Sequence, residues 1–216
     1  MTQYIKIYAQ ITHQTSTNFQ SIVERMLQQG LTNLYLLLCT QGGSVYDGVA
    51  IYNFLKDLPI EINTHNFGSV DSIGIPIFCL GRNRTTTPYT KFSFHPVSMQ
   101  ISINSTLDEV SLIERLEHLK REQNNIINII SSVTNKHIKE IQELINNRTV
   151  LGSEEAQTLG LVTEIKTGVI PVRSNLTSIY DTYTTQQEQP FFTGNVPFKT
   201  FIPAPPSGQT EIINSI

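Results

Sequence analysis

The sequence contains no tryptophan and only two cysteines among its 216 residues, and charged residues make up just 15% of it. Cys39 and Cys79 each lie inside an apolar run, which predicts buried free thiols rather than a disulfide or a metal-binding pair. Because 15 Lys and Arg stand against 18 Asp and Glu, the net charge of −3 offers no cationic surface for a phosphate backbone. We therefore expect neither a disulfide scaffold nor a nucleic-acid partner.

Long apolar runs and clustered metal ligands are also missing from the sequence. The N-terminus has no cationic start followed by an apolar stretch, and no later run is long enough to cross a bilayer. We expect a cytoplasmic protein that has no membrane partner. The histidines other than His95 are scattered without the spacing of metal ligands, so we expect no metal and no other cofactor.

The first part of the sequence repeats a pattern of strand, turn and helix. Strands are predicted over 4–11, 34–39 and 60–67, each followed by a helical pattern that ends at a glycine or before a proline. The segment 34–39 is apolar without alternation, as is typical of a strand covered on both faces. Such repeats imply an α/β fold with right-handed crossovers, a mostly parallel sheet, and a ligand site at the carboxyl ends of the strands.

The second part predicts a further strand, a long helix and a tail. A short strand over 89–94 leads into His95, and Thr106 with Glu109 predicts a capping box that opens the longest helical pattern. Ser153 is the expected N-cap of the last helix. Beyond Gly168 the composition shifts to Thr, Pro, Gln and Ser. We therefore predict one domain over 1–168 and a poorly ordered tail over 169–216.

Two turns with glycines fall at the carboxyl ends of predicted strands. A hydroxyl nucleophile needs an exposed turn, a neighbouring base and backbone N–H groups directed at the developing oxyanion. Ser72 lies where a strand passes into a helix, and Gly43 can bring a second N–H close to a substrate because it has no side chain. His95 is the candidate base. On these features alone, a helix cap at Ser72 and a structural role for His95 are the commoner interpretations.

Four segments in order change that interpretation, because together they resemble the proteolytic subunit of Clp protease across about residues 4–166. They are LYLLLCTQGGSVYDGVAIYNFL, with the family's Gly-Gly turn; GSVDSIGIPIFCLG, its nucleophile segment; FSFHP, its histidine strand; and SEEAQTLGLVTEI, its last helix. The resemblance implies a ClpP/crotonase-like fold with a mostly parallel sheet, outer helices and a protruding handle helix.

The resemblance also implies a function and roles for individual residues. It makes Ser72 the nucleophile and His95 its base in a serine endopeptidase that cleaves small or unfolded polypeptides by acyl transfer. The chemistry would take place inside a homo-oligomeric ring, either a heptamer or a stacked double ring. The implied oxyanion donors are the N–H groups of Gly43 and Ile73, and the implied substrate-aligning residues are Gly42, Ser44 and Val45.

The sequence departs from the family pattern at several positions. Arg148 stands where the family has its triad aspartate, and Asn147 beside it is the candidate third member, able to orient the imidazole without stabilising its charge. Asp71 replaces a small residue before the nucleophile, and we expect it to cap the helix. The sequence shows no counterpart of the N-terminal segment that contacts an AAA+ unfoldase in the family, which puts that partner in question.

Two alternatives to an active peptidase stay open. A catalytically impaired ring subunit that assembles with an active paralogue would account for Arg148 in place of an acid. A crotonase-like acyl-CoA enzyme would share the repeating unit and the paired oxyanion donors. It explains Ser72 and His95 poorly, because crotonases typically rely on carboxylates.

Overall fold

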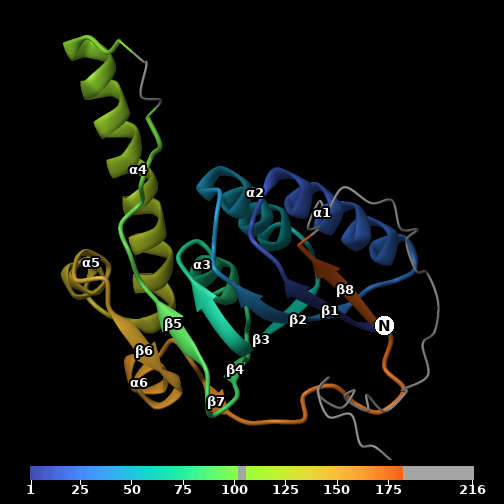
Figure 1. The fold of residues 1–216 in the computed structure, drawn as a ribbon. Coiled ribbons are helices and arrows are strands. Elements are labelled where there is room, and N and C mark those ends of the chain that lie inside the picture. The colour runs from blue at the N-terminus through green and yellow to red at the C-terminus, as the bar shows by residue number, and fades with distance from the viewer. Residues whose placement is uncertain (102–105, 182–216) are drawn as a thin grey trace, which may run out of the picture. The chain divides into compact units, whose positions relative to one another are not determined.

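The computed structural model describes residues 1–101 and 106–181, which form an α/β fold (Figure 1). The strands are β1 (Thr2–Tyr8), β2 (Asn33–Thr40), β3 (Glu61–Asp71), β4 (Arg84–Thr86), β5 (Lys91–Ser93), β6 (Val150–Gly152), β7 (Glu164–Ile165) and β8 (Leu176–Tyr180). The helices are α1 (His13–Gln28), α2 (Val45–Lys56), α3 (Gly74–Phe78), α4 (Glu109–Thr134), α5 (Ile138–Asn146) and α6 (Ser153–Leu159).

The strands form one sheet in the order β6-β5-β3-β2-β1-β8, with β4 pairing to β3 and β7 pairing to β4. Every pairing is parallel except that of β5 with β6. The predicted fold class, α/β with a mostly parallel sheet, is therefore confirmed. Parallel strands bring their carboxyl ends to one edge of the sheet, and that edge carries the turns after β2 and β3.

Helices α1 and α2 lie side by side over one face of the central strands (Figure 1). Their apolar stripes meet the sheet through Phe19 and Val23 of α1 and Ile51 and Leu55 of α2, all fully buried. Removing each such side chain from water stabilises the fold by about 1.5–3 kcal/mol. This packing anchors the first turns of both helices above the carboxyl edge.

Helix α4 projects away from the sheet as the predicted handle (Figure 1). Its C-terminal half is held by Ile126, Ile127 and Ile130, which are buried in the core. Toward its N-terminus the apolar residues Val110, Leu112, Ile113 and Leu116 are at least 49% exposed. The apolar stripe read from the sequence thus serves the core over one half of the helix and faces solvent over the other.

Both predicted helix caps in this region were wrong. The N-cap of α4 is Asp108, whose carboxylate accepts the Ser111 N–H at 2.8 Å, rather than Thr106 paired with Glu109. Ser153 does not cap α6, because its hydroxyl donates to the Pro88 carbonyl at 2.7 Å. Pro88 is 65 residues from Ser153, which no local cap pattern reveals, whereas Asp108 is a local cap two residues after the predicted Thr106.

The predicted boundary after residue 168 falls short of the folded region. Residues Leu176–Tyr180 form β8, which pairs with β1 in parallel, and Ile179 is buried in the core. The polar composition of this stretch hides the strand, since its stability comes from pairing with β1 rather than from its own apolar pattern. The rest of the predicted tail, 182–216, lies outside the described residues.

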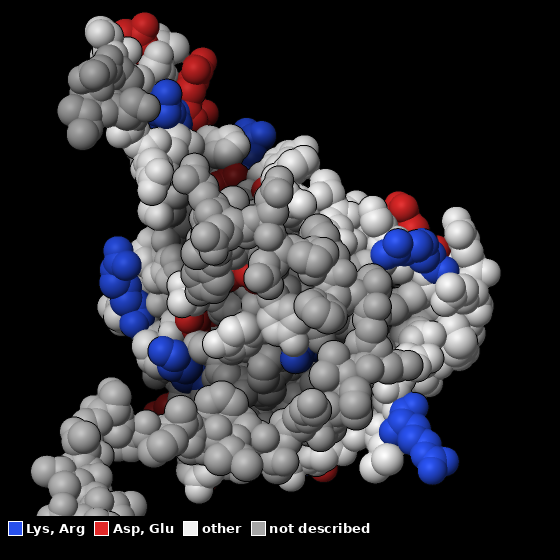
Figure 2. Space-filling view, turned by 45° about the vertical axis from the view of Figure 1, so that its right-hand side comes forward, with Lys and Arg blue, Asp and Glu red and all other residues white. Residues whose placement is uncertain are grey.

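Two further properties are the distribution of surface charge and the apolar content of the helices. On the face drawn in Figure 2, the Lys and Arg side chains of the described residues are scattered among other residues rather than gathered into a patch. Within residues 1–101 and 106–181, no helix has both the length and the apolar content needed to cross a bilayer.

Candidate functional site

The segment before Ser72 is a strand rather than the turn expected from its glycine and serine. Strand β3 continues to Asp71, and its last residues pair in parallel with β5, with Asp71 opposite Ser93. The Ser72 N–H then donates to the Ser93 carbonyl at 2.9 Å. Since neighbouring strands lie about 4.8 Å apart, this register brings the backbones of Ser72 and His95, two residues beyond Ser93, to the same edge of the sheet.

Ser72 has a left-handed backbone conformation, with φ of 56°. This conformation is costly for a residue that carries a Cβ, and it turns the chain sharply from β3 toward α3. In the part of the chain that the structure describes, α3 has no side-chain cap, so its first turn does not use the Ser72 hydroxyl. The half-buried side chain is free for another role.

The turn after β2 packs directly against Ser72. Gly42 and Gly43 have φ of 82° and 144°. A Cβ added to Gly42 would lie 2.7 Å from the Ser72 Cβ, and one added to Gly43 would lie 2.2 Å from the Ile11 carbonyl oxygen. Only glycine fits either position. Gly42 therefore lies beside the serine, and Gly43 lies against Ile11.

The backbone of this turn is bound to the chain just before α1. The Ile11 N–H donates to the Gly42 carbonyl at 2.7 Å, and the Ser44 N–H donates to the Ile11 carbonyl at 2.8 Å. In such a parallel bridge the N–H of the middle residue, Gly43, points away from Ile11. Within residues 1–101 and 106–181 nothing accepts a hydrogen bond from the N–H of Gly43 or of Ile73. Both are available to a bound group.

Ser44 and Val45 join this turn to α2. The Ser44 hydroxyl accepts the Asp47 N–H at 3.2 Å and caps α2, and Val45 is the first residue of the helix. One edge of the Gly42–Val45 segment is therefore occupied by Ile11. The Gly43 N–H points to the opposite edge of this segment.

His95 has its ring fixed by the backbone of the next residue. Its Nδ1 lies 3.0 Å from the Pro96 carbonyl oxygen. Because a carbonyl oxygen only accepts, Nδ1 carries the hydrogen, and in the neutral ring the lone pair is on Nε2. An uncharged group thus holds the half-buried imidazole in the tautomer that a general base needs.

The strand beside His95 supplies no carboxylate at the position of the family's acid. Strand β6 runs antiparallel to β5, and the Phe94 N–H donates to the Thr149 carbonyl at 2.8 Å, so Arg148 lies near His95. Arg148 has φ of 51°, and Asn147 ends α5; both residues are exposed. Among the described residues, neither side chain forms a hydrogen bond with His95.

Asp71 does not cap the helix, contrary to expectation. Its Oδ1 accepts the Ser93 N–H at 3.2 Å and the Ser69 hydroxyl at 2.5 Å. The carboxylate therefore fastens β3 to β5 immediately before the Ser72 turn. Sequence reasoning missed this role because it placed 68–71 in a turn; once that stretch is known to be a strand, the side chain of Asp71 lies on the face shared with Ser93.

Comparisons with known proteins agree with this geometry. The family described as Clp protease matches residues 1–169. ATP-dependent Clp protease proteolytic subunit 3 of Rhodococcus jostii is 24% identical over 148 residues, which cover 68% of this chain and 71% of the relative. Subunit 2 of Chlamydia pneumoniae is 26% identical over 137 residues, which cover 62% and 66%. The solved structure of a ClpP1 mutant from Listeria monocytogenes is similar with a TM-score of 0.70 at 20% identity, over 77% of this chain and 92% of that one.

Proposed function

Because the chain belongs to the Clp protease family, we propose that it is a serine endopeptidase that hydrolyses small or unfolded polypeptides through an acyl-enzyme on Ser72. The observation that carries the proposal is the hydrogen bond from the Ser72 N–H to the Ser93 carbonyl. It fixes the strained turn that carries the hydroxyl beside the strand that carries His95. The family assignment also favours peptide hydrolysis over the crotonase-like acyl-CoA alternative.

The proposed reaction assigns one step to each of these groups. The His95 Nε2 takes the proton of the Ser72 hydroxyl as its oxygen attacks a peptide carbonyl, and later returns that proton to the leaving amine. The N–H groups of Gly43 and Ile73 stabilise the tetrahedral oxyanion. Water then attacks the acyl-enzyme, with His95 again acting as base, and frees Ser72.

Substrate alignment follows from the free edge of the turn after β2. The substrate backbone is extended and adds as a strand along Gly42, Ser44 and Val45, since the other edge of that segment is paired with Ile11. Binding through the backbone accepts many side chains, which suits a peptidase of unfolded polypeptides.

The lack of a carboxylate at position 148 lowers the rate of acylation that we expect. The Pro96 carbonyl holds the tautomer of His95 but carries no charge to stabilise the imidazolium that forms in the transition state. Asn147, the candidate third member, would likewise orient the ring without neutralising it. We therefore expect slow acylation relative to a triad that has a carboxylate.

The same observation favours a second candidate function. A ring subunit with little activity of its own, assembled with an active paralogue, would tolerate Arg148 where an acid is expected. In either case we propose assembly into a ring, homo-oligomeric for the active peptidase and shared with the paralogue for the impaired subunit. The exposed apolar residues at the N-terminal half of α4 would be buried between subunits. Docking of an AAA+ unfoldase is a further proposal, which rests on the family alone.

Labelling with a fluorophosphonate tests the peptidase directly. The probe is expected to modify the purified protein at Ser72, with Ser72→Ala removing the label and the assembly size from light scattering unchanged. Labelling that survives Ser72→Ala would contradict the assignment. An unlabelled wild-type protein of ring size would instead support the impaired subunit.

A further inference from the structure

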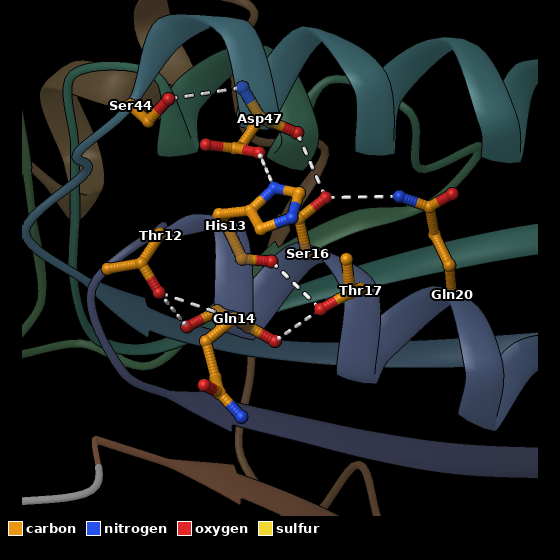
Figure 3. A network of polar contacts seen from close by, with 9 residues as sticks. Thr12, His13, Gln14, Ser16, Thr17, Gln20, Ser44 and Asp47 are labelled. Atoms are coloured by element: carbon orange, nitrogen blue, oxygen red, sulfur yellow. Dashed lines mark hydrogen bonds and ion pairs between the residues drawn. The ribbon is translucent and has the colours of Figure 1, made fainter.

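A polar network joins the first turns of α1 and α2 outside the groups assigned to the reaction (Figure 3). The His13 Nδ1 lies 3.2 Å from the Asp47 Oδ1, and the Ser16 hydroxyl donates to the Asp47 carbonyl oxygen at 3.4 Å. Gln20 donates to the Ser16 hydroxyl at 3.1 Å. His13 is 82% exposed whereas Asp47 is only 10% exposed, so a mostly buried carboxylate is bound by a surface histidine.

Asp47 occupies the position of a capping-box acid but does not act as one. It is the third residue after Ser44, the N-cap of α2, and the Ser44 hydroxyl accepts its N–H. In a complete capping box the acidic side chain would reach back to the N–H of the N-cap residue. Here that N–H donates to the Ile11 carbonyl instead. The carboxylate of Asp47 is turned toward α1, where His13 donates to it.

This arrangement matters because Gly43 lies between the two backbone bonds to Ile11. The Ser44 N–H bond and the Gly42 carbonyl bond together set the direction of the Gly43 N–H. A mostly buried carboxylate without a donor is costly, so loss of His13 would drive Asp47 toward the N–H that a capping-box acid reaches, that of Ser44. Asp47 would then compete with the Ile11 carbonyl, and the turn would loosen.

We propose that His13 is a positioning residue for the oxyanion-binding turn. By engaging Asp47, it keeps the Ser44 N–H on Ile11 and thereby keeps the Gly43 N–H directed at the substrate carbonyl. The proposal rests on the proposed function, because it gives His13 a role in acyl transfer through Gly43. The proposal requires no contact between His13 and the substrate.

The test compares His13→Ala with His13→Asn, whose amide can still donate to Asp47. We expect His13→Ala to slow fluorophosphonate labelling of Ser72 about tenfold, as a small displacement of a catalytic group does, and His13→Asn to restore most of the rate. Arg82→Ala is the matched control. It removes an exposed ion pair with Glu61, at 3.6 Å, at the opposite end of β3.

Two further readouts separate positioning from a general structural effect. The thermal midpoint should change little in His13→Ala, because Asp47 would exchange the His13 donor for the Ser44 N–H. Affinity for a peptide boronate, whose adduct places an oxygen on the oxyanion donors, should fall more than affinity for the matching uncleaved peptide. Equal losses for both ligands would overturn the proposal.

Hydrogen exchange measured by mass spectrometry tests the positioning role of His13 independently of the proposed peptidase activity. Peptides that cover residues 9–13 and 41–48 should exchange faster in His13→Ala and return toward wild type in His13→Asn. If wild-type protein is not labelled, the peptidase assignment fails, while faster exchange still supports the hold of His13 on the turn. Unchanged exchange overturns the positioning role whether or not the protein is labelled.

Discussion

The two sides of the candidate site are built very differently. On the nucleophile side, Gly42 and Gly43 are fitted against Ser72 and Ile11 so closely that neither has room for a Cβ. On the acid side, Asn147 and Arg148 are exposed, and the only group on the His95 Nδ1 among the described residues is the Pro96 carbonyl. The contrast teaches that the turn proposed to bind the oxyanion is closely packed, whereas the position proposed for an acid is open to solvent. If the chain is a peptidase, transition-state stabilisation by the backbone carries most of its rate.

The largest expected effect comes from breaking the nucleophile side. Gly43→Ala should reduce fluorophosphonate labelling more than about 100-fold, the cost of losing one oxyanion donor, because its Cβ would meet the Ile11 carbonyl oxygen at 2.2 Å. Gly30→Ala is the control, since Gly30 also has a positive φ but no atom within 4 Å of an added Cβ. Similar labelling of the two variants would show that the close fit has no catalytic role.

The next largest expected effect is the pH dependence of the free energy of unfolding. Burial, and then the nearby charge of Lys166, lower the pKa of His65 to about 4 from its usual 6.5. The folded state therefore keeps His65 neutral while the unfolded state takes up a proton. Stability is fully present above pH 6.5 and falls as the pH drops from 6.5 to about 4, by at most about 3 kcal/mol.

Urea unfolding at several pH values checks this prediction. The His65 Nδ1 lies 2.8 Å from the Thr85 hydroxyl, and an Asn amide at this position can still donate to that hydroxyl. His65→Asn should therefore remove most of the change in the free energy of unfolding between pH 6.5 and 4. A wild-type free energy of unfolding that is flat across this range would be at odds with the buried neutral His65.

Restoring an acid would sharpen the comparison from the other side. Arg148→Asp places a carboxylate in the turn before β6, at a left-handed position that Asp tolerates better than most residues. We expect labelling of Ser72 to rise about tenfold, because the charge stabilises the imidazolium. Arg148→Asn, which changes the shape without adding charge, should have little effect. Equal rates for the two variants would mean that no charge is needed there.

The smallest expected effect concerns the hydrogen bond by which Asp71 joins β3 to β5. Asp71→Ala removes the acceptor of the Ser93 N–H and should cost about 1–2 kcal/mol of stability and slow labelling a few-fold. Asp57→Ala, at the C-cap of α2, is the control for loss of an aspartate. Unchanged labelling in Asp71→Ala, measured below the unfolding transition, would show that Asp71 does not hold the Ser72 turn.

The features predicted correctly from sequence are those specified by local chemistry. The apolar run at 34–39 and the glycines after it identify a buried strand and a tight turn without reference to the rest of the chain. Where partners are distant, the prediction fails. Residues 68–71 form a strand because β5 lies beside them, and Leu176–Tyr180 form one because β1 does. The cap of α6 was misassigned for the same reason, because the Ser153 hydroxyl donates to the distant Pro88 carbonyl.

The candidate site shows the same division. Ser72, His95, Gly43 and Ile73 were chosen from motifs in the sequence, and the structure brings their backbones to one edge of the sheet. The partner of the His95 Nδ1 could not be predicted, because a backbone carbonyl has no signature in the sequence. Asp71 and Asp47 carried a visible signal, an acid near a glycine turn, but their partners come from other strands and helices.

A crystal structure of the protein with a peptide boronate bound to Ser72 would test the central claim most directly. The account predicts a tetrahedral adduct with one oxygen about 2.7–3.1 Å from the N–H groups of Gly43 and Ile73. It also predicts that the His95 Nε2 faces Ser72 Oγ while Nδ1 stays on the Pro96 carbonyl. An adduct whose oxygen points away from Gly43, or an imidazole turned to the far side of the sheet, would contradict it.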